Sequence, residues 1–212
     1  MKNTIITAVV LVAGIVLLAF GFSGNKQETD VTNHRESSLN TNKMQKEIYF
    51  AGGCFWGTEH FFKLVNGVVS TEVGYANGIV DKPSYQDVTT GKTGFAETVK
   101  VVYDPEVIDL ELLIDLFFKT IDPTSLNRQG NDIGTQYRTG IYFTDKNDQA
   151  LITEKIKGLA ASFNNPIVVE NEELKNFFDA ETYHQDYLDK NPGGYCHIGQ
   201  DLFEVARKAN RD

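Results

Sequence analysis

The sequence predicts an α+β fold in which helices pack on a mixed sheet. Strand-like and helix-like segments alternate from residue 47 onward. The strand-like segments are short apolar runs bounded by turn residues, and the helix-like segments carry apolar residues at three- and four-residue spacing. A hydrophobic content of 41% and a charged content of 23% are typical of a globular protein.

The expected strands end at turn signals, such as the Asn-Gly pair at 77–78 that closes the second one. In the third strand, alternation places Glu97 on the apolar face and Lys100 on the opposite face. We expect strands at residues 47–51, 68–75, 97–103, 136–143 and 166–170.

Helices are expected between these strands. In the second, four apolar residues from Leu112 to Phe117 share one face. The expected helices cover residues 54–63, 109–121 and 145–161. Beyond Asn191 the chain is rich in glycine, and we expect an irregular C-terminal tail.

The N-terminus predicts a targeting segment. Lys2 precedes an almost wholly apolar run over residues 5–22, so we expect either a signal peptide or an N-terminal membrane anchor at 1–23. Residues 24–46 are polar and without aromatic side chains, which predicts a disordered tether before a folded domain at 47–212. Both alternatives send that domain across a membrane, so we expect an extracytoplasmic protein, periplasmic or secreted.

The formal net charge of −9 argues against nucleic acid as a partner, because phosphate binding needs clustered Lys and Arg. The two cysteines, Cys54 and Cys196, are too few for a disulfide framework or a structural zinc site. They suffice for one reversible disulfide.

Cys54 follows two glycines and opens an expected helix, where free backbone N–H groups favour a negative charge. We therefore expect a lowered thiol pKa and a reactive thiolate. Phe55 and Trp56 beside it suggest an apolar wall suited to a methyl group or thioether. The alternative is that Cys54 is a small buried core residue.

Glu97 is expected among apolar side chains, where a carboxyl group has a raised pKa and can stay protonated. It is therefore a candidate general acid. The alternative is a residue at a strand end that pairs with a lysine. Asp132, Tyr137 and Tyr85 adjoin glycine-punctuated loops and could hydrogen-bond a polar ligand atom, although each alone could equally be structural.

Cys196 lies in the glycine-rich tail, where mobility would let it reach Cys54 and form a disulfide. The adjacent His197 lacks the further ligands that a zinc site needs. We expect no metal site. The other histidines are His34 in the tether and His60 and His184 on expected helices, and all four are interpreted as structural or surface residues.

Four motifs resemble the peptide methionine sulfoxide reductase A family. They are Gly-Cys-Phe-Trp-Gly at 53–57, Gly-x-Thr-Gly-x-Ala-Glu at 91–97, Asp-x-Gly-x-Gln-Tyr-Arg at 132–138 and Asn-Pro-x-Gly-Tyr-Cys at 191–196. They stand in the family's order, and the resemblance covers residues 46–199.

The resemblance implies a role for each motif residue and a two-layer, ferredoxin-like α+β sandwich with an irregular tail. Cys54 would attack the substrate sulfur, Glu97 would donate a proton, and Cys196 would recycle the enzyme. The substrate would contact Phe55, Trp56, Tyr85, Asp132 and Tyr137.

The implied substrate is the S epimer of methionine sulfoxide, free or in oxidised proteins. No bound cofactor is implied, only a thioredoxin-like reductant, and we expect a monomer. The family usually has His where this chain has Phe95, so we expect altered pKa tuning rather than lost activity. No cysteine follows Cys196, so one disulfide step should suffice.

Two other functions compete with this interpretation. A cysteine hydrolase or acyltransferase would need His60 or His184 near Cys54, with an orienting carboxylate. A binding module would need only a structural disulfide between Cys54 and Cys196.

Overall fold

The structure is a computed structural model that describes residues 44–210, all within one compact unit. The expected signal or anchor segment and most of the expected tether lie outside the described residues. Between residues 44 and 210, no helix combines the length and apolar character that a membrane crossing requires.

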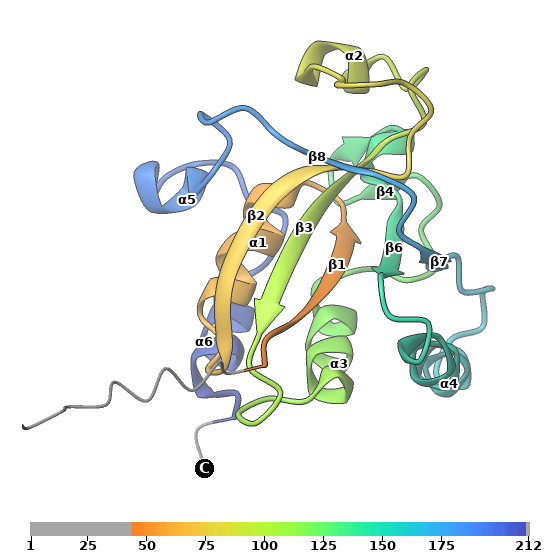
Figure 1. Ribbon diagram of the computed structural model, residues 1–212, viewed down its shortest axis with the longest axis vertical. Coiled ribbons are helices and arrows are strands. Elements are labelled where there is room, and N and C mark those ends of the chain that lie inside the picture. Colours follow the sequence, from red (N-terminus) through yellow and green to blue (C-terminus); the bar gives the residue numbers. More distant parts are fainter. Residues whose placement is uncertain (1–43, 211–212) are drawn as a thin grey trace, which may run out of the picture. The chain divides into compact units, whose positions relative to one another are not determined.

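The centre of the fold is a six-stranded sheet with the strand order β7-β6-β1-β3-β2-β8 (Figure 1). Neighbouring strands are antiparallel except β6 and β7, which are parallel. The mixed sheet of the expected α+β class is therefore confirmed. The strands are β1 (Lys46–Gly52), β2 (Val68–Ala76), β3 (Ala96–Tyr103), β6 (Thr139–Phe143), β7 (Glu170–Glu173) and β8 (Phe177–Asp179).

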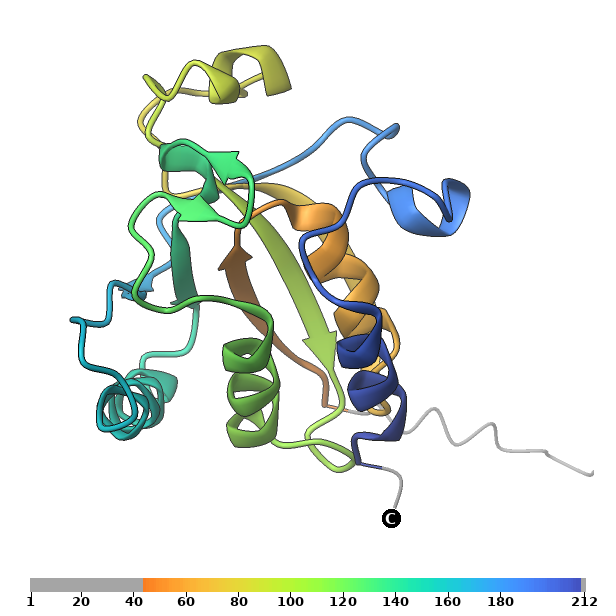
Figure 2. The same ribbon diagram turned by 180° about the vertical axis from the view of Figure 1, so that it is seen from behind.

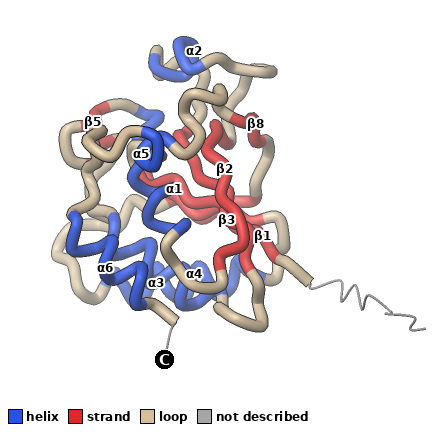
Figure 3. Tube along the Cα trace, turned by 90° about the vertical axis from the view of Figure 1, so that its left-hand side faces the viewer, coloured by secondary structure: helices blue, strands red, loops and turns tan. Residues whose placement is uncertain are grey.

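Helices α1 (Phe55–Lys63), α3 (Leu110–Thr120) and α6 (Gln200–Lys208) cover one face of the sheet (Figure 2). Helix α4 (Asp148–Ala160) packs beside α3. The short elements α2, β4 with β5, η1 and α5 lie towards the end of the sheet where β1 meets α1 (Figures 1 and 3). Their bounds are Tyr85–Thr89, Arg128–Gln129, Asp132–Ile133, Thr135–Tyr137 and Tyr187–Lys190, respectively.

The alternation of β1 explains how the sheet divides the core. Ile48 and Phe50 belong to the main core under the helices, whereas Tyr49 and Ala51 belong to a smaller cluster. Ring stacking reinforces the main core, because Phe50 packs face to face on Phe62 with ring centroids 4.7 Å apart. The first strand is thereby held on both faces, and its end is a rigid base for the residues that follow.

The two edge strands are joined by only three residues, Leu174 to Asn176. Five inter-strand spacings separate β7 from β8, about 24 Å in a flat sheet. Four Cα–Cα steps reach at most about 15 Å, so the sheet has to curl. The segment crosses the sheet between β7 and β8 in Figure 1, and Asn77 and Asn176 fasten it by hydrogen bonds to neighbouring backbone.

Several expected elements need correction. The expected strand at 136–143 begins only at Thr139, because residues 135–137 form the single turn η1. The expected strand at 166–170 is wrong in place: the paired residues are Glu170–Glu173, and Glu170 is held by Arg138 and by the Tyr142 hydroxyl at 2.6 Å.

The expectation of an irregular C-terminal tail is wrong for its last part, because Gln200–Lys208 form α6. This helix buries Phe203 and Ala206 against the main core, and that packing stabilises it. His184 lies in a turn, not on a helix as expected.

Candidate active site

Cys54 lies where β1 ends and α1 begins, as the glycine pair predicted. Gly53 has a backbone φ of +86°, which favours glycine, and a Cβ there would come within 2.6 Å of the Gln129 side chain. The chain can therefore turn sharply from strand to helix. The Cys54 side chain is 7% exposed, so the thiol is largely enclosed but not sealed.

Cys54 is the N-cap of α1. The first free N–H of the helix, on Phe55, donates to Oε2 of Glu97 at 3.1 Å. The backbone N–H of Trp56 is left to hydrogen-bond Cys54. The start of α1 thus serves the carboxyl and the sulfur with separate N–H groups.

Glu97 is 1% exposed on β3, on the inner side of the sheet as predicted. Burial raises the pKa of Glu97 to about 8, although the hydrogen bond from Phe55 lowers it. The charge of Asp132 adds a smaller upward contribution. The alternative lysine pairing is absent among the described ion pairs, in which Lys100 joins Glu47 and Glu72. Glu97 is therefore a protonated carboxyl at neutral pH.

The expectation that the helix start lowers the pKa of Cys54 is wrong for the resting site. Burial raises this pKa well above the usual thiol value, and the charge of Glu97 adds to the rise. The Trp56 N–H hydrogen bond lowers it by less. Because Glu97 is neutral below about pH 8, its contribution is weak at physiological pH, and burial is the obstacle that remains.

The three expected oxygen-binding residues converge on this pair. Tyr85 begins α2 and makes a side-chain hydrogen bond with Tyr137 of η1. Burial raises the pKa of both phenols, and the nearby Glu97 raises both further. The charge of Asp132 on β5 raises the pKa of Cys54 as well as that of Glu97, so it lies near both groups. The two hydroxyls are neutral donors beside the carboxyl.

Phe55 and Trp56 form the expected apolar wall, and the structure shows what holds the indole. Trp56 stacks on Tyr187 with ring centroids 3.7 Å apart, and its Nε1–H donates to Nδ1 of His184 at 3.1 Å. The His184 ring also packs against Phe55 and Tyr85. Both partners were missed, because no sequence signal links positions about 130 residues apart in the chain.

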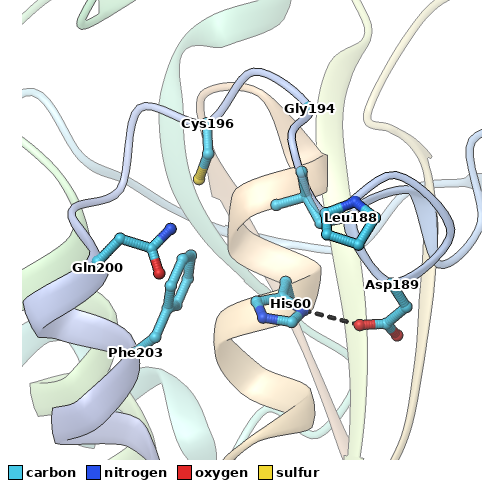
Figure 4. Close-up of a pocket in the computed structure, with 8 residues that line it drawn as sticks. His60, Leu188, Asp189, Gly194, Cys196, Gln200 and Phe203 are labelled. Atoms are coloured by element: carbon cyan, nitrogen blue, oxygen red, sulfur yellow. Dashed lines mark hydrogen bonds and ion pairs between the residues drawn. The ribbon is translucent and has the colours of Figure 1, made fainter.

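Cys196 rests on α1, with its sulfur 2.7 Å from where a Cβ of Gly57 would lie. Both cysteines are free thiols. Cys196 also lines a pocket of about 340 Å³ together with His60, Asp189 and Phe203 (Figure 4). Burial raises the pKa of this thiol, opposed by a hydrogen bond from the Ile198 N–H. The negative charge of Cys196 would raise the pKa of Cys54, so the two sulfurs are electrostatic neighbours.

The tail also contacts the site through Tyr195, whose hydroxyl donates to Oδ2 of Asp132 at 3.0 Å. His197 sits behind Gly53, with its two ring nitrogens buried. Phe95, which replaces the family's usual His, packs on Gly78 and edge-on against Phe178. Its expected effect on the pKa values of the site stays a prediction.

Comparison with known proteins decides the family. The model of the peptide methionine sulfoxide reductase family matches residues 46–211. The chain belongs to the peptide methionine sulfoxide reductase family. The reductase is 52% identical over 166 residues to the enzyme of Lachnoclostridium phytofermentans, covering 78% of this chain and all of that one. It is 57% identical over 153 residues to the Mycoplasma pneumoniae enzyme, covering 72% and 98%.

Solved structures agree with that assignment. Reduced Mxr1 of Saccharomyces cerevisiae is similar with a TM-score of 0.70 at 44% identity, covering 73% of this chain and 91% of that one. The methionine sulfoxide reductase A of Corynebacterium diphtheriae gives 0.66 at 39%, covering 72% and 77%. The reductase therefore acts on methionine sulfoxide, and its mixed α+β sheet is that of its relatives.

The geometry does not favour the rival functions. The hydrolase would need a histidine beside Cys54, but Nδ1 of His184 accepts from Trp56, and His60 lines the pocket of Cys196, whose lining does not include Cys54. The binding module would need a structural disulfide, whereas both thiols are free. Within residues 44–210, no three His, Cys, Asp or Glu side chains gather as metal ligands.

Proposed function

We propose that the reductase uses Cys54 as nucleophile and Glu97 as proton donor. The observation that carries this assignment is the enclosed pair itself: a carboxyl with a pKa of about 8 is held by the Phe55 N–H, one residue from the thiol. Such a carboxyl holds its proton at neutral pH and can release it when negative charge develops beside it.

In the first step, the Cys54 thiol releases its proton to solvent, and its sulfur attacks the substrate sulfur as a thiolate to form a sulfur–sulfur bond. The Glu97 proton passes to the sulfoxide oxygen, so no oxide has to leave as a bare anion. The sulfur–sulfur bond and the substrate S–O bond then break as the oxygen moves to the Cys54 sulfur, which becomes a sulfenic acid, and the thioether departs as methionine. Cys54 is oxidised and the substrate is reduced by the same two electrons, while Glu97 ends as a carboxylate.

The surrounding residues would orient the substrate. The hydroxyls of Tyr85 and Tyr137 would hold the sulfoxide oxygen, with Asp132 nearby, because they are neutral donors grouped around Glu97. Phe55 and Trp56 would enclose the methyl group. We propose the S epimer as substrate, free or within oxidised proteins, whose repair restores apolar methionine side chains.

Cys196 would then attack the sulfenic acid to form a disulfide with Cys54. A thioredoxin-like protein would reduce that disulfide by thiol exchange. Support comes from the contact of the Cys196 side chain with α1, the helix that begins directly after Cys54. The cycle needs neither a metal nor a bound organic cofactor, since thiols carry all the electrons.

The experiment is incubation of the full chain with each epimer of methionine sulfoxide and dithiothreitol, with methionine counted by chromatography. We expect turnover of the S epimer only. Equal turnover of the R epimer would contradict the proposed pocket, and loss of all turnover in Cys54→Ser is the matched control.

We also propose an extracytoplasmic, monomeric enzyme carried by residues 1–23 and tethered by 24–46, with residues 47–212 as the catalytic domain. Its fold would be a two-layer sandwich of the ferredoxin-like kind, supported by the central strand order β6-β1-β3-β2. N-terminal sequencing of the mature protein and membrane fractionation would separate a cleaved signal from a retained anchor. Recovery of the intact chain in the cytoplasm would contradict both.

A further inference from the structure

The pocket beside Cys196 contains a histidine–carboxylate pair that the chemistry at Cys54 does not use. Nδ1 of His60 lies 2.9 Å from Oδ1 of Asp189. Burial raises the pKa of Asp189, but the hydrogen bonds and charges of Lys63 and then of His60 lower it. Together they outweigh burial, so the pKa of Asp189 lies below its usual value. Asp189 is therefore an anion that can only accept, so Nδ1 of His60 donates to it and Nε2 is the ring nitrogen that Asp189 does not bind.

Helix α1 brings this histidine into the same pocket as Cys196. The Cys196 sulfur rests where a side chain of Gly57 would begin, and His60 is three residues further along α1. Residues three apart share a helix face, with Cβ atoms about 5–6 Å apart. Cys54, at the N-cap, is three residues before Gly57. The Cys196 sulfur thus meets α1 at a position between Cys54 and His60 along the helix.

The pocket orients the imidazole. In Figure 4 the Cys196 sulfur points into the pocket from the tail, and the second ring nitrogen of His60 points away from Asp189 into the same space. Phe203 of α6 packs edge-on against the His60 ring, with centroids 4.8 Å apart at 88°. A volume of about 340 Å³ admits water, so one water molecule can link the two groups.

We propose that His60, oriented by Asp189, accepts the proton of the Cys196 thiol when this sulfur attacks the Cys54 sulfenic acid. The S–H proton passes to Nε2, directly or through one water. The thiolate forms the S–S bond as the S–O bond of the sulfenic acid breaks, and the oxygen leaves as water after taking a proton from solvent. His60 then returns its proton to solvent, and no outside oxidant is needed.

The step needs such a base, because burial disfavours the Cys196 thiolate in the resting protein. The charged groups around His60 come from the elements that pack against it. Asp189 lies on α5 and Asp186 at its N-cap, and Lys63 on α1 hydrogen-bonds both. The α6 residues that line the pocket, Gln200 and Phe203, are uncharged.

The inference rests on the proposed function, and the experiment separates the two. The full chain is mixed with excess S epimer and no reductant, and methionine and free thiols are counted in quenched samples between pH 6 and 9. In His60→Gln, we expect the first equivalent of methionine at the wild-type rate. Disulfide formation should be at least about tenfold slower at pH 7, recover as pH rises, and be accelerated by added imidazole.

Asp189→Asn should give an intermediate rate, because the amide oxygen can still accept from Nδ1–H without a charge. Gln200→Ala is the matched control, since it lines the same pocket without a titratable group and should change neither step. A wild-type rate and pH profile of disulfide formation in His60→Gln would overturn the inference and leave the proposed function standing. Absence of the first methionine in the wild-type chain would refute the proposed function itself.

Discussion

The Glu97 carboxyl accepts the backbone N–H of Phe55, the first residue of α1, at 3.1 Å. The next backbone N–H of the helix, on Trp56, remains for the Cys54 sulfur. The bond from Phe55 fixes the carboxyl within reach of the oxygen that the proposed reaction must protonate. Two successive N–H groups thus position both partners of the first step.

We predict that Glu97→Gln slows the formation of the Cys54 sulfenic acid by about 10²–10⁴-fold. An amide is similar in size and can still accept from Phe55, but it has no acidic proton. The measurement is a single-turnover assay of methionine release. In the wild type the rate should rise with pH as the Cys54 thiolate fraction grows, and level off above about 8, where Glu97 loses its proton. An unchanged rate in the variant would show that the proton comes from elsewhere.

The same carboxyl should make stability depend on pH. The pKa of Glu97 is about 8 when folded, and a Glu in an unfolded chain has a pKa near ~4.3. The folded protein therefore binds this proton more tightly than the unfolded chain does. The stability that this proton contributes is fully present below about pH 4 and is lost as pH rises to about 8. We expect Glu97→Gln to gain stability relative to the wild type across this window, by a few kcal/mol on the order-of-magnitude scale. Urea unfolding at several pH values tests this, and a constant difference between the two proteins would refute it.

We predict that Cys196→Ser releases about one equivalent of methionine per enzyme and then stops when thioredoxin is the reductant. The first step needs only Cys54 and Glu97, whereas exchange with thioredoxin needs the disulfide. Methionine is counted against active sites. Sustained turnover with thioredoxin would remove Cys196 from its proposed role.

Gly57→Ala should slow disulfide formation without slowing the first methionine. Its added Cβ would lie 2.7 Å from the Cys196 sulfur, so the tail has to move away from α1. Free thiols are counted after one turnover. The control is Gly158→Ala on α4, where no atom lies within 4 Å of an added Cβ. It should leave both steps unchanged and stabilise the helix by about 0.5–1 kcal/mol.

His184→Leu should lower kcat/KM by about tenfold, because the Trp56 N–H loses its acceptor and the indole its fixed orientation. His184→Asn offers an oxygen near the position of Nδ1 and should restore most of the loss. Steady-state assays of both variants test the pair. Equal losses in the two variants would mean that His184 only fills space.

The sequence predicted the elements with strong local patterns and missed those formed by distant contacts. The periodic helix at 109–121 is confirmed within one residue at each end as Leu110–Thr120. The apolar run at 166–170 resembled a strand, yet Val168 donates to Pro123 in a loop. The paired residues are the acidic Glu170–Glu173, which no β-propensity favours. The helix at 200–208 did carry a signal, since Leu202, Phe203 and Ala206 share a face.

The candidate site was predicted to a similar extent: the motif residues were identified, and the contacts that support them were missed. The residues that local motifs identified lie near Cys54, on short elements at one end of the sheet or, for Cys196, in the tail. Its supporting contacts join residues far apart in the chain, such as Lys63 with Asp189 and Trp56 with His184. The direction of the Cys54 pKa shift was missed for a related reason. The helix start is a local feature, whereas the burial that outweighs it depends on the whole fold.

The three-residue link between β7 and β8 couples the two edge strands of the sheet. Leu174 donates to Phe143 on one side, and Asn176 accepts from Asn77 on the other. Neither edge strand can separate from the sheet without displacing the other. Amide protons on both edge strands should therefore exchange with solvent in one concerted opening. One extra residue inserted in this link would weaken the pairing of both edge strands. Their unpaired backbone groups could then hydrogen-bond to strands of neighbouring molecules.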